Sequence, residues 1–388
     1  MMSDLISLEQ AHSFEVYPKR DICLTHGVGA VVFDETGKEY IDCVAGVGVA
    51  SLGHGNEEIV KAVTEQASRL ISCPGIFYND VRAKALQRLA GIAPLGLDRA
   101  FLCNSGTEAM EAAIKFARLT TGKNGFISAM RGFHGRSMGA LSATHKYRDE
   151  FEPLIPGHQF VAYNKLDKLE SVMDENTAAV ILELVQGEGG VRPANPDYID
   201  GVVALCKQRG VLLIIDEIQT GFGRTGHMFA CEKYGIVPDM MTIAKAMAGG
   251  LPMGAVLCSE QIASAAGKHG STFGGNPLAS AACIATIDYI QNNNLCDNAK
   301  ARGDWLARQL NSESLKVVRE IRQQGLMIGI ELKIKVKPVI QRLLEVGVLA
   351  LPAGPTVLRL LPPLVITESQ IARVRDALVE VLGEFAVG

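Results

Sequence analysis

One lysine lies among small and apolar residues that could change its reactivity. Lys245 lies within Thr242–Gly254, where most of the other residues are alanine, glycine or methionine. Removal from water lowers the pKa of a lysine amine and makes the amine a competent nucleophile toward a carbonyl group. The ordinary alternative is a lysine at a helix edge whose charged end reaches solvent. Lys245 is therefore a candidate catalytic nucleophile.

A second candidate is an acid that follows an apolar run. Residues 211–215 are continuously apolar, and Asp216 and Glu217 come directly after them. Open α/β sheets bind ligands at the carboxyl ends of their strands, so we expect Asp216 at such a site. An acid in that place can hold a metal or pair with a cation. No Walker A motif accompanies it, which disfavours nucleotide hydrolysis.

A third segment has the composition of an anion site. Ser105, Gly106 and Thr107 connect the apolar run 99–103 to an amphipathic segment. The backbone amides at a helix N-terminus and the helix dipole favour a phosphate, and glycine lets it approach closely. The spacing of Ser105 and Glu108 predicts a capping box. An ordinary capped helix is the alternative.

The segment Met130–Ser137 combines an aromatic ring with a cation. Phe133 could stack on a flat ring, and Arg136 could bind a carboxylate through two hydrogen bonds. We expect His134 to be a structural hydrogen-bonding residue rather than a base.

A charged residue also occurs inside an apolar run near the C-terminus. Arg359 lies within Val357–Leu361, and a buried arginine requires a partner. Glu188, in the glycine-rich segment Gln186–Gly190, is the candidate partner. A purely structural ion pair is the alternative.

The elements expected around these residues alternate between short apolar runs and segments of helical period. This alternation predicts an α/β fold with a mostly parallel central sheet covered by helices. An N-terminal hairpin and several C-terminal strands predict a smaller α+β unit built from both termini. We expect an N-terminal segment at 1–49, a large domain at 50–285 and a C-terminal domain at 286–388. The expected strands are 99–103, 178–182, 211–215, 29–33, 38–41, 317–318, 326–332 and 357–360, and the expected C-terminal helices are 338–344 and 368–382.

Composition excludes several classes of function. The chain has 388 residues and a net charge of -4, so no global positive field would attract nucleic acid. No charge-free apolar stretch is long enough to span a bilayer. Acidic residues among the apolar ones in residues 1–20 lack the basic-then-apolar order of a signal peptide, so we do not expect one there. The nine cysteines contain no C-x-x-C spacing, which predicts reduced thiols in a cytoplasmic protein. The scattered histidines predict no metal site.

The segment Gly221–Gly226 matches the dinucleotide fingerprint in its letters. It neither ends a strand directly nor opens a clear helix, so the match is weak. A nicotinamide-dependent dehydrogenase remains the alternative from a different class of enzyme. A non-catalytic scaffold is a further alternative, which the intact Lys245 disfavours.

In chain order, a phosphate loop, an aromatic ring, a strand-end acid and an apolar lysine are what pyridoxal phosphate requires. From about Tyr17 to the C-terminus the sequence resembles the class III aminotransferases. The segments that carry the resemblance are Asn104–Ala109, Gly132–Arg136, Gln186–Gly190, Asp216–Gly226 and Ser271–Pro277. Gly46–His54 and Leu361–Leu364 resemble the acetylornithine branch, whereas Tyr17–Asp21, Gly53–Asn56 and Ala353–Arg359 resemble a branch that uses substrates tethered to an acidic amino-group carrier protein.

The resemblance implies a fold-type I homodimer with active sites at the subunit interface. Lys245 would bind the cofactor and act as general base, and Asp216 would keep the ring nitrogen protonated. The other implied cofactor contacts are Gln219 near the phenolic oxygen, Phe133 stacked on the ring, Ser105, Gly106 and Thr107 on the phosphate, and Thr272 on the phosphate of the partner subunit.

The resemblance also implies the substrate contacts. Arg136 would bind the α-carboxylate of the amino donor, and Arg359 would bind that of glutamate after Glu188 releases it. Tyr17 would shape the mouth of the pocket. In relatives the segment equivalent to Ile71–Tyr78 often lines the pocket, and here that segment differs.

The implied reaction is ping-pong transamination of the distal amine of N2-acetylornithine, or a related N-blocked ornithine or lysine, with 2-oxoglutarate. The products would be the semialdehyde and glutamate, within arginine or lysine biosynthesis. Carrier-bound lysine or ornithine and 4-aminobutyrate or another ω-amine are alternative donors. Lys19 and Arg20 are candidates for contact with an acidic carrier, and a solvated charge pair is the alternative.

Overall fold

The computed structural model describes residues 4–385, and its largest sheet has seven strands in the order β4-β12-β11-β10-β7-β5-β6. Strand β12 is antiparallel to both neighbours, whereas the other pairings are parallel. The mostly parallel central sheet is therefore confirmed. The bounds are β4 Arg99–Cys103, β5 Gly125–Ala129, β6 His158–Val161, β7 Thr177–Leu182, β10 Leu212–Asp216, β11 Met240–Ile243 and β12 Gly254–Cys258.

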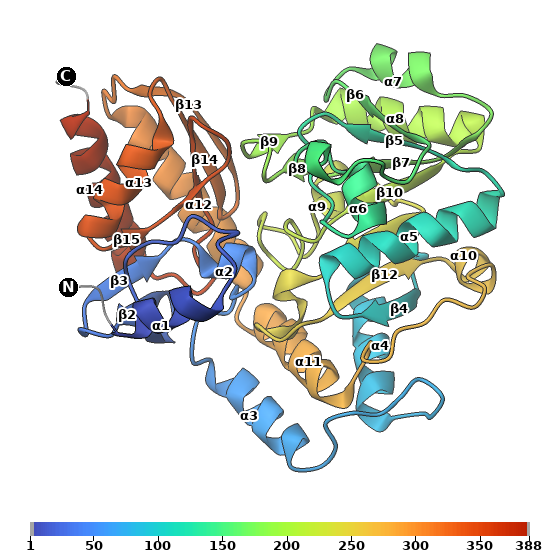
Figure 1. Ribbon diagram of the computed structural model, residues 1–388, viewed down its shortest axis with the longest axis horizontal. Helices are drawn as coiled ribbons and strands as arrows, with labels where there is room; N and C mark the ends of the chain where they lie inside the picture. Colours follow the sequence, from blue (N-terminus) through green and yellow to red (C-terminus); the bar gives the residue numbers. More distant parts are fainter. Residues whose placement is uncertain (1–3, 386–388) are drawn as a thin grey trace.

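Helices surround this sheet in the part of the molecule at the right of Figure 1. Helix α5 lies against β12, β11 and β4, and its apolar side is formed by the buried Ala109, Ala112, Ala113 and Phe116. The helical elements are α3 Glu57–Ala67, α4 Asp80–Ile92, α5 Gly106–Thr121, α6 Met138–Ala143, η1 Asp149–Phe151, α7 Leu166–Val172, α8 Pro196–Arg209, α9 Ala230–Tyr234, η2 Lys245–Ala248, α10 Glu260–Ser264 and α11 Pro277–Asn292. Helix α11 continues through residue 285, and the domain boundaries stay a prediction.

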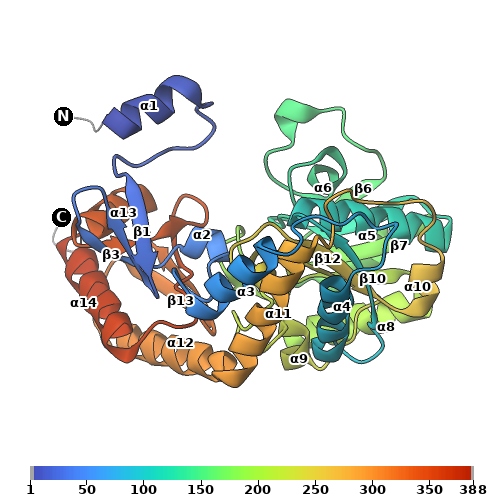
Figure 2. The same ribbon diagram turned by 90° about the horizontal axis from the view of Figure 1, so that it is seen from below.

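Both ends of the chain build the smaller part, at the left of Figures 1 and 2. The hairpin β2-β3 is antiparallel, and β15 pairs in parallel with β3, so N-terminal and C-terminal strands share one sheet. A second sheet of this part has the order β13-β14-β17-β16. The short pair β8-β9 follows β7 in the chain and lies with the larger part in Figure 1. The bounds are α1 Asp4–His12, β1 Leu24–Val28, β2 Val31–Asp34, β3 Glu39–Asp42, α2 Ala45–Gly48, β8 Val185–Gln186, β9 Arg192–Pro193, α12 Leu295–Ser312, β13 Val318–Gln324, β14 Met327–Leu332, α13 Val336–Glu345, β15 Val348–Leu349, β16 Leu351–Pro352, β17 Val357–Leu360 and α14 Glu368–Glu384.

The polar candidates come from the carboxyl ends of the central strands. Asp216 is the last residue of β10, and Lys245 begins η2 two residues after β11. Ser105 follows β4 and caps α5. Because these strands run in the same direction, their ends bring the three side chains to one edge of the sheet.

The Gly221–Gly226 segment is a packed loop between the two parts of the molecule. Arg224 is fully buried and donates to the carbonyl oxygens of Leu326 (3.0 Å) and Pro362, and to Ser51 Oγ (3.1 Å). A Cβ atom at Gly223 would lie 2.8 Å from the Leu364 side chain. The glycines and the arginine of this segment therefore serve packing here.

Candidate active site

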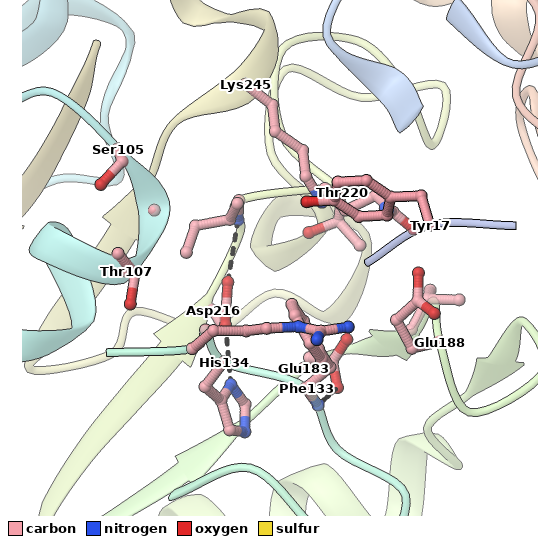
Figure 3. A pocket seen from close by; sticks show the side chains of 16 residues that line it. Tyr17, Ser105, Thr107, Phe133, His134, Glu183, Glu188, Asp216, Thr220 and Lys245 are labelled. Atoms are coloured by element: carbon pink, nitrogen blue, oxygen red, sulfur yellow. Dashed lines mark hydrogen bonds and ion pairs between the residues drawn. The ribbon is translucent and has the colours of Figure 1, made fainter. Parts of the chain in front are cut away.

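The carboxyl ends of the strands border a cavity of about 400 Å³. Figure 3 shows Ser105 and Thr107 at one end of it and Tyr17 and Glu188 at the other, with Lys245 and Asp216 between them. The lining residues are Tyr17, Ser105, Gly106, Thr107, Phe133, His134, Gly135, Arg136, Glu183, Val185, Glu188, Asp216, Ile218, Gln219, Thr220 and Lys245. Most of the predicted site residues thus line one cavity.

Lys245 is held in a strained conformation. Its φ of +47° lies in the left-handed region, which residues other than glycine rarely adopt. Burial lowers the pKa of Lys245 to about 8, and the charge of Arg359 adds to this effect while Asp216 opposes it. The expected desolvation of the amine is confirmed, and a substantial fraction of it is neutral near pH 8.

Asp216 is oriented by two hydrogen bonds. Its Oδ1 accepts from the backbone N–H of Ile218 (3.0 Å), and its Oδ2 lies 2.7 Å from Nδ1 of His134. Both side chains are buried. Burial opposes protonation of His134, but the hydrogen bond and charge of Asp216 outweigh it and raise the pKa of this histidine. His134 is a structural hydrogen-bonding residue, as expected.

The opposite end of the cavity has the features of a phosphate site. Ser105 Oγ accepts from the N–H of Glu108 (3.3 Å), so its own proton is free to be donated. Among the described residues, the backbone amides of Gly106 and Thr107 have no hydrogen-bond partner. The capping box is only half formed, since Glu108 accepts from the N–H of Asn104 (2.8 Å) rather than that of Ser105. The carboxylate reaches one residue further back than the box requires.

Arg136 is held by aromatic rings rather than by an acid. Its guanidinium carbon lies 4.2 Å from the ring centre of Tyr147 and 6.0 Å from that of Phe133. No carboxylate lies within ion-pair distance of Arg136 in the part of the chain that the structure describes. Arg136 is therefore a cation free to bind an external carboxylate.

The second arginine, Arg359, does not itself line the cavity and is paired with a residue that does. Arg359 Nη2 lies 2.6 Å from Glu188 Oε1, and its Nη1 donates to Gln219 Oε1 (3.3 Å). Arg359 is 2% exposed, whereas the Glu188 side chain is 26% exposed. The predicted pairing of Glu188 with Arg359 is confirmed, and the acid is the more accessible partner.

Sequence reasoning missed Glu183. This glutamate directly follows β7 and is 8% exposed at the cavity wall. The sequence signal that could have found it is the one that identified Asp216, because both acids come directly after a continuous apolar run in the sequence. Burial raises the pKa of Glu183 to about 7, opposed by the charge of His134 and by hydrogen bonds from two backbone amides.

Several predicted residues lie outside the cavity of this chain. Thr272 is exposed and does not line it. Lys19 pairs with Glu9 (2.7 Å), which agrees with the solvated-pair alternative. Arg20 is not a free surface cation, since it donates to the carbonyl oxygen of Ala350. The side chains of Ile71–Tyr78 do not line the cavity, and Tyr78 is fully exposed.

The residues present fit pyridoxal phosphate. The lysine amine, the buried carboxylate and the amide-rich helix N-terminus suit the aldehyde, the pyridinium nitrogen and the phosphate of that cofactor. A Cβ atom at Gly106 would lie 2.9 Å from the Ile218 side chain, so glycine keeps this end of the cavity open. In residues 4–385 no helix is long and apolar enough to cross a membrane, and no group of three or more His, Cys, Asp or Glu side chains is placed to hold a metal.

The fold and the site define a pyridoxal-phosphate-dependent enzyme of fold type I. Residues 15–382 match the family model described as Aminotransferase class-III, and the chain belongs to this family. It is 49% identical to the [LysW]-aminoadipate semialdehyde transaminase of Deinococcus radiodurans, over 98% of this chain and 90% of the relative. It is 44% identical to the acetylornithine aminotransferase of Methanosarcina mazei, over 96% and 95%. The structure of the ornithine aminotransferase from Toxoplasma gondii superposes with a TM-score of 0.93, at 32% identity over 99% of this chain and 95% of the other.

Proposed function

We propose that the protein transfers the distal amine of an N2-blocked ornithine or lysine to 2-oxoglutarate, giving the semialdehyde and glutamate. N2-acetylornithine is the first candidate donor. The observation that carries the proposal is the contrast between two arginines at the site: Arg136 lines the cavity without an acidic partner among the described residues, and Arg359 is neutralised by Glu188, which lines the cavity. Two substrates that present their carboxylates differently require this kind of dual site.

Pyridoxal phosphate, when bound, supplies an electron sink for the carbanion that forms as the amine-bearing carbon loses its proton. Nζ of Lys245 would take up that proton and give it back as general base, which requires the neutral amine that burial favours. Asp216, oriented by His134, holds a proton at the ring nitrogen. Phe133 and Gln219 also line the cavity, where Phe133 would stack on the cofactor ring and Gln219 would contact its phenolic oxygen.

The two arginines would bind the substrate carboxylates differently in the two half-reactions. With Glu188 on Arg359, Arg136 is the unpaired guanidinium among the described residues that line the cavity, and a donor bound there by its α-carboxylate extends its distal amine toward Lys245. Glutamate reacts through its α-amine, so its α-carboxylate takes Arg359 and its side-chain carboxylate takes Arg136. Glu188 must release Arg359 for this step, and its partial exposure lets it move toward solvent.

Replacement of Arg136 tests the donor. We expect Arg136→Ala to lower kcat/KM for N2-acetylornithine by about 100-fold, because the site loses a charge-assisted carboxylate contact. 4-Aminobutyrate has no N-blocked α-carbon and therefore no α-carboxylate of the kind that Arg136 is proposed to bind, so activity with this donor should not need Arg136. If the variant kept its activity toward N2-acetylornithine, the proposed binding mode would be wrong, and retained activity with other ω-amines would favour that donor class.

A carrier-bound lysine or ornithine is the second candidate donor. The 49% identity to a transaminase named for LysW supports this alternative. Tyr17 lines the cavity and is 71% exposed, so the mouth of the site is open to a tethered substrate. A comparison of kcat/KM for N2-acetylornithine and for the donor attached to an acidic carrier protein distinguishes the two.

We also propose that the protein acts as a homodimer. Large apolar side chains are exposed together on the segment 70–78 and at Phe273, beside the exposed Thr272. Patches of this kind mark protein interfaces. In a dimer Thr272 would contact the phosphate of the partner's cofactor, so Thr272→Ala is expected to weaken cofactor affinity. Sedimentation of the holoenzyme tests the assembly itself.

A further inference from the structure

Glu183 binds two separate loops of the active site at once. Its Oε2 accepts a hydrogen bond from the backbone N–H of Phe133 (3.1 Å), and its Oε1 accepts one from that of Gly187 (3.2 Å). The first loop leads to Arg136. The second is the turn between β8 and β9, where Gly187 directly precedes Glu188. Figure 3 shows Glu183 beside Phe133 in the cavity wall.

Both loops have little freedom to shift elsewhere. A Cβ atom at Gly187 would lie 2.1 Å from Gln219 Oε1, so the turn packs directly against a residue that also contacts Arg359. The other loop is packed as tightly at Gly132, because a Cβ atom there would lie 2.9 Å from the carbonyl oxygen of Ala129. We therefore expect a change at Glu183 to alter the positions of the Phe133 ring and of the Glu188 turn together.

We propose that Glu183 is a positioning residue whose ionised carboxylate fixes Phe133 and the Glu188 turn relative to each other, and so sets the balance between donor and glutamate in the two half-reactions. We call the two hydrogen bonds the Glu183 clamp. The consequence for the two substrates rests on the proposed function. The clamp itself rests only on the contacts of the protein.

The charge on Glu183 decides whether both hydrogen bonds form. An ionised carboxylate accepts strongly through both oxygens, whereas in the protonated form one oxygen carries the proton and is a much weaker acceptor. The titratable groups that interact with it are His134, Asp216, Lys245 and Tyr163. Burial raises the pKa of Glu183 to about 7, so the clamp is complete above that pH and loosens below it.

Hydrogen exchange of the holoenzyme, resolved to single amides by mass spectrometry, tests the clamp without using activity. In Glu183→Gln the side-chain NH2 group faces a backbone N–H, so one of the two amides loses its partner. We expect exchange at Phe133 or Gly187 to accelerate about 10-fold to 100-fold in this isosteric variant, the range for a lost charge-assisted hydrogen bond. Unchanged protection at both amides would overturn the proposal.

Glu111→Gln is a matched control. One oxygen of Glu111, Oε1, accepts from both Gly139 (2.7 Å) and Ala140 (3.2 Å) at the start of α6. The amide oxygen of glutamine can keep both bonds, so exchange at these positions and activity should match the wild type. Acceleration at Phe133 and Gly187 in this control as well would assign the effect to general loosening and reject the clamp.

A kinetic comparison tests the functional consequence. The ratio of kcat/KM for glutamate to that for the amino donor should change at least tenfold in Glu183→Gln, and its dependence on pH near 7 should disappear. An unchanged ratio together with faster exchange would reject the link to substrate balance. If the wild type converted none of the donors, but exchange at Phe133 or Gly187 was still faster in Glu183→Gln than in the wild type, the proposed function would be refuted and the clamp would stand.

Discussion

Replacement of Glu188 by alanine should improve glutamate as a substrate. In the wild type, glutamate must displace Glu188 from Arg359, which is 2% exposed and lies 2.6 Å from the acid. Loss of one partner of a fully buried pair costs about 3–5 kcal/mol. Solvent screens the 26% exposed Glu188, and Gln219 stays 3.3 Å from Arg359, so we expect about 1–3 kcal/mol here. This corresponds to a gain of about 5- to 150-fold in kcat/KM for glutamate.

The assay is the single half-reaction of the holoenzyme with glutamate, and separately with the amino donor, followed by cofactor absorbance. Donor kcat/KM should not rise, because an unpaired Arg359 competes with Arg136 for the donor carboxylate. Glu320→Ala is the control, since it removes an acid from Arg322, outside the cavity. An equal change for both substrates in Glu188→Ala would refute the reasoning that Glu188 acts as the exchangeable partner of Arg359.

Three further predictions follow from single side chains. Lys245→Ala should bind pyridoxal phosphate but turn over about 10²- to 10⁴-fold more slowly, as measured in steady state, because the general base is lost; normal turnover would contradict its role. Arg224→Ala should lower the free energy of unfolding by about 3–5 kcal/mol in urea denaturation, because three buried acceptors on Leu326, Pro362 and Ser51 lose their donor; a loss under 1 kcal/mol would contradict this account. Burial lowers the pKa of His158 to about 4. As the pH drops from about 6.5 toward 4, His158 therefore binds a proton in the unfolded chain before it does so in the folded chain, and the free energy of unfolding falls by up to about 3 kcal/mol. His158→Phe should flatten that part of the pH dependence of unfolding, and an unchanged slope would exclude His158 as its source.

Local sequence patterns were sufficient to predict the central sheet and the placement of Asp216 and Lys245 at the ends of its strands. Strand β4 runs over the predicted residues 99–103, and Asp216 and Lys245 lie at strand ends, because continuous apolar runs end where the chain leaves the core. The partnership of Glu188 and Arg359 was also predictable, since a charge inside an apolar strand requires compensation.

Long-range contacts limited the remaining predictions. Glu183 acts through the backbone amides of two loops, and no spacing in the sequence reveals which amides a strand-end acid will meet. Glu108 turned to Asn104 instead of closing a capping box, a difference of one residue that depends on side-chain conformation. The sequence suggests that Arg20 is a surface cation, but it donates to the carbonyl oxygen of Ala350, 330 residues away in the chain. No local pattern reveals a contact of that range.

The most direct test of the account is an absorbance spectrum of the protein with pyridoxal phosphate, followed by addition of N2-acetylornithine without any keto acid. We expect a near-visible band of the bound cofactor that bleaches with this donor and returns when 2-oxoglutarate is added. A band that bleaches only with glutamate would exclude free N2-acetylornithine and direct the account to carrier-bound or other ω-amine donors. No band, or a band that no amino donor bleaches, would contradict the assignment as an aminotransferase.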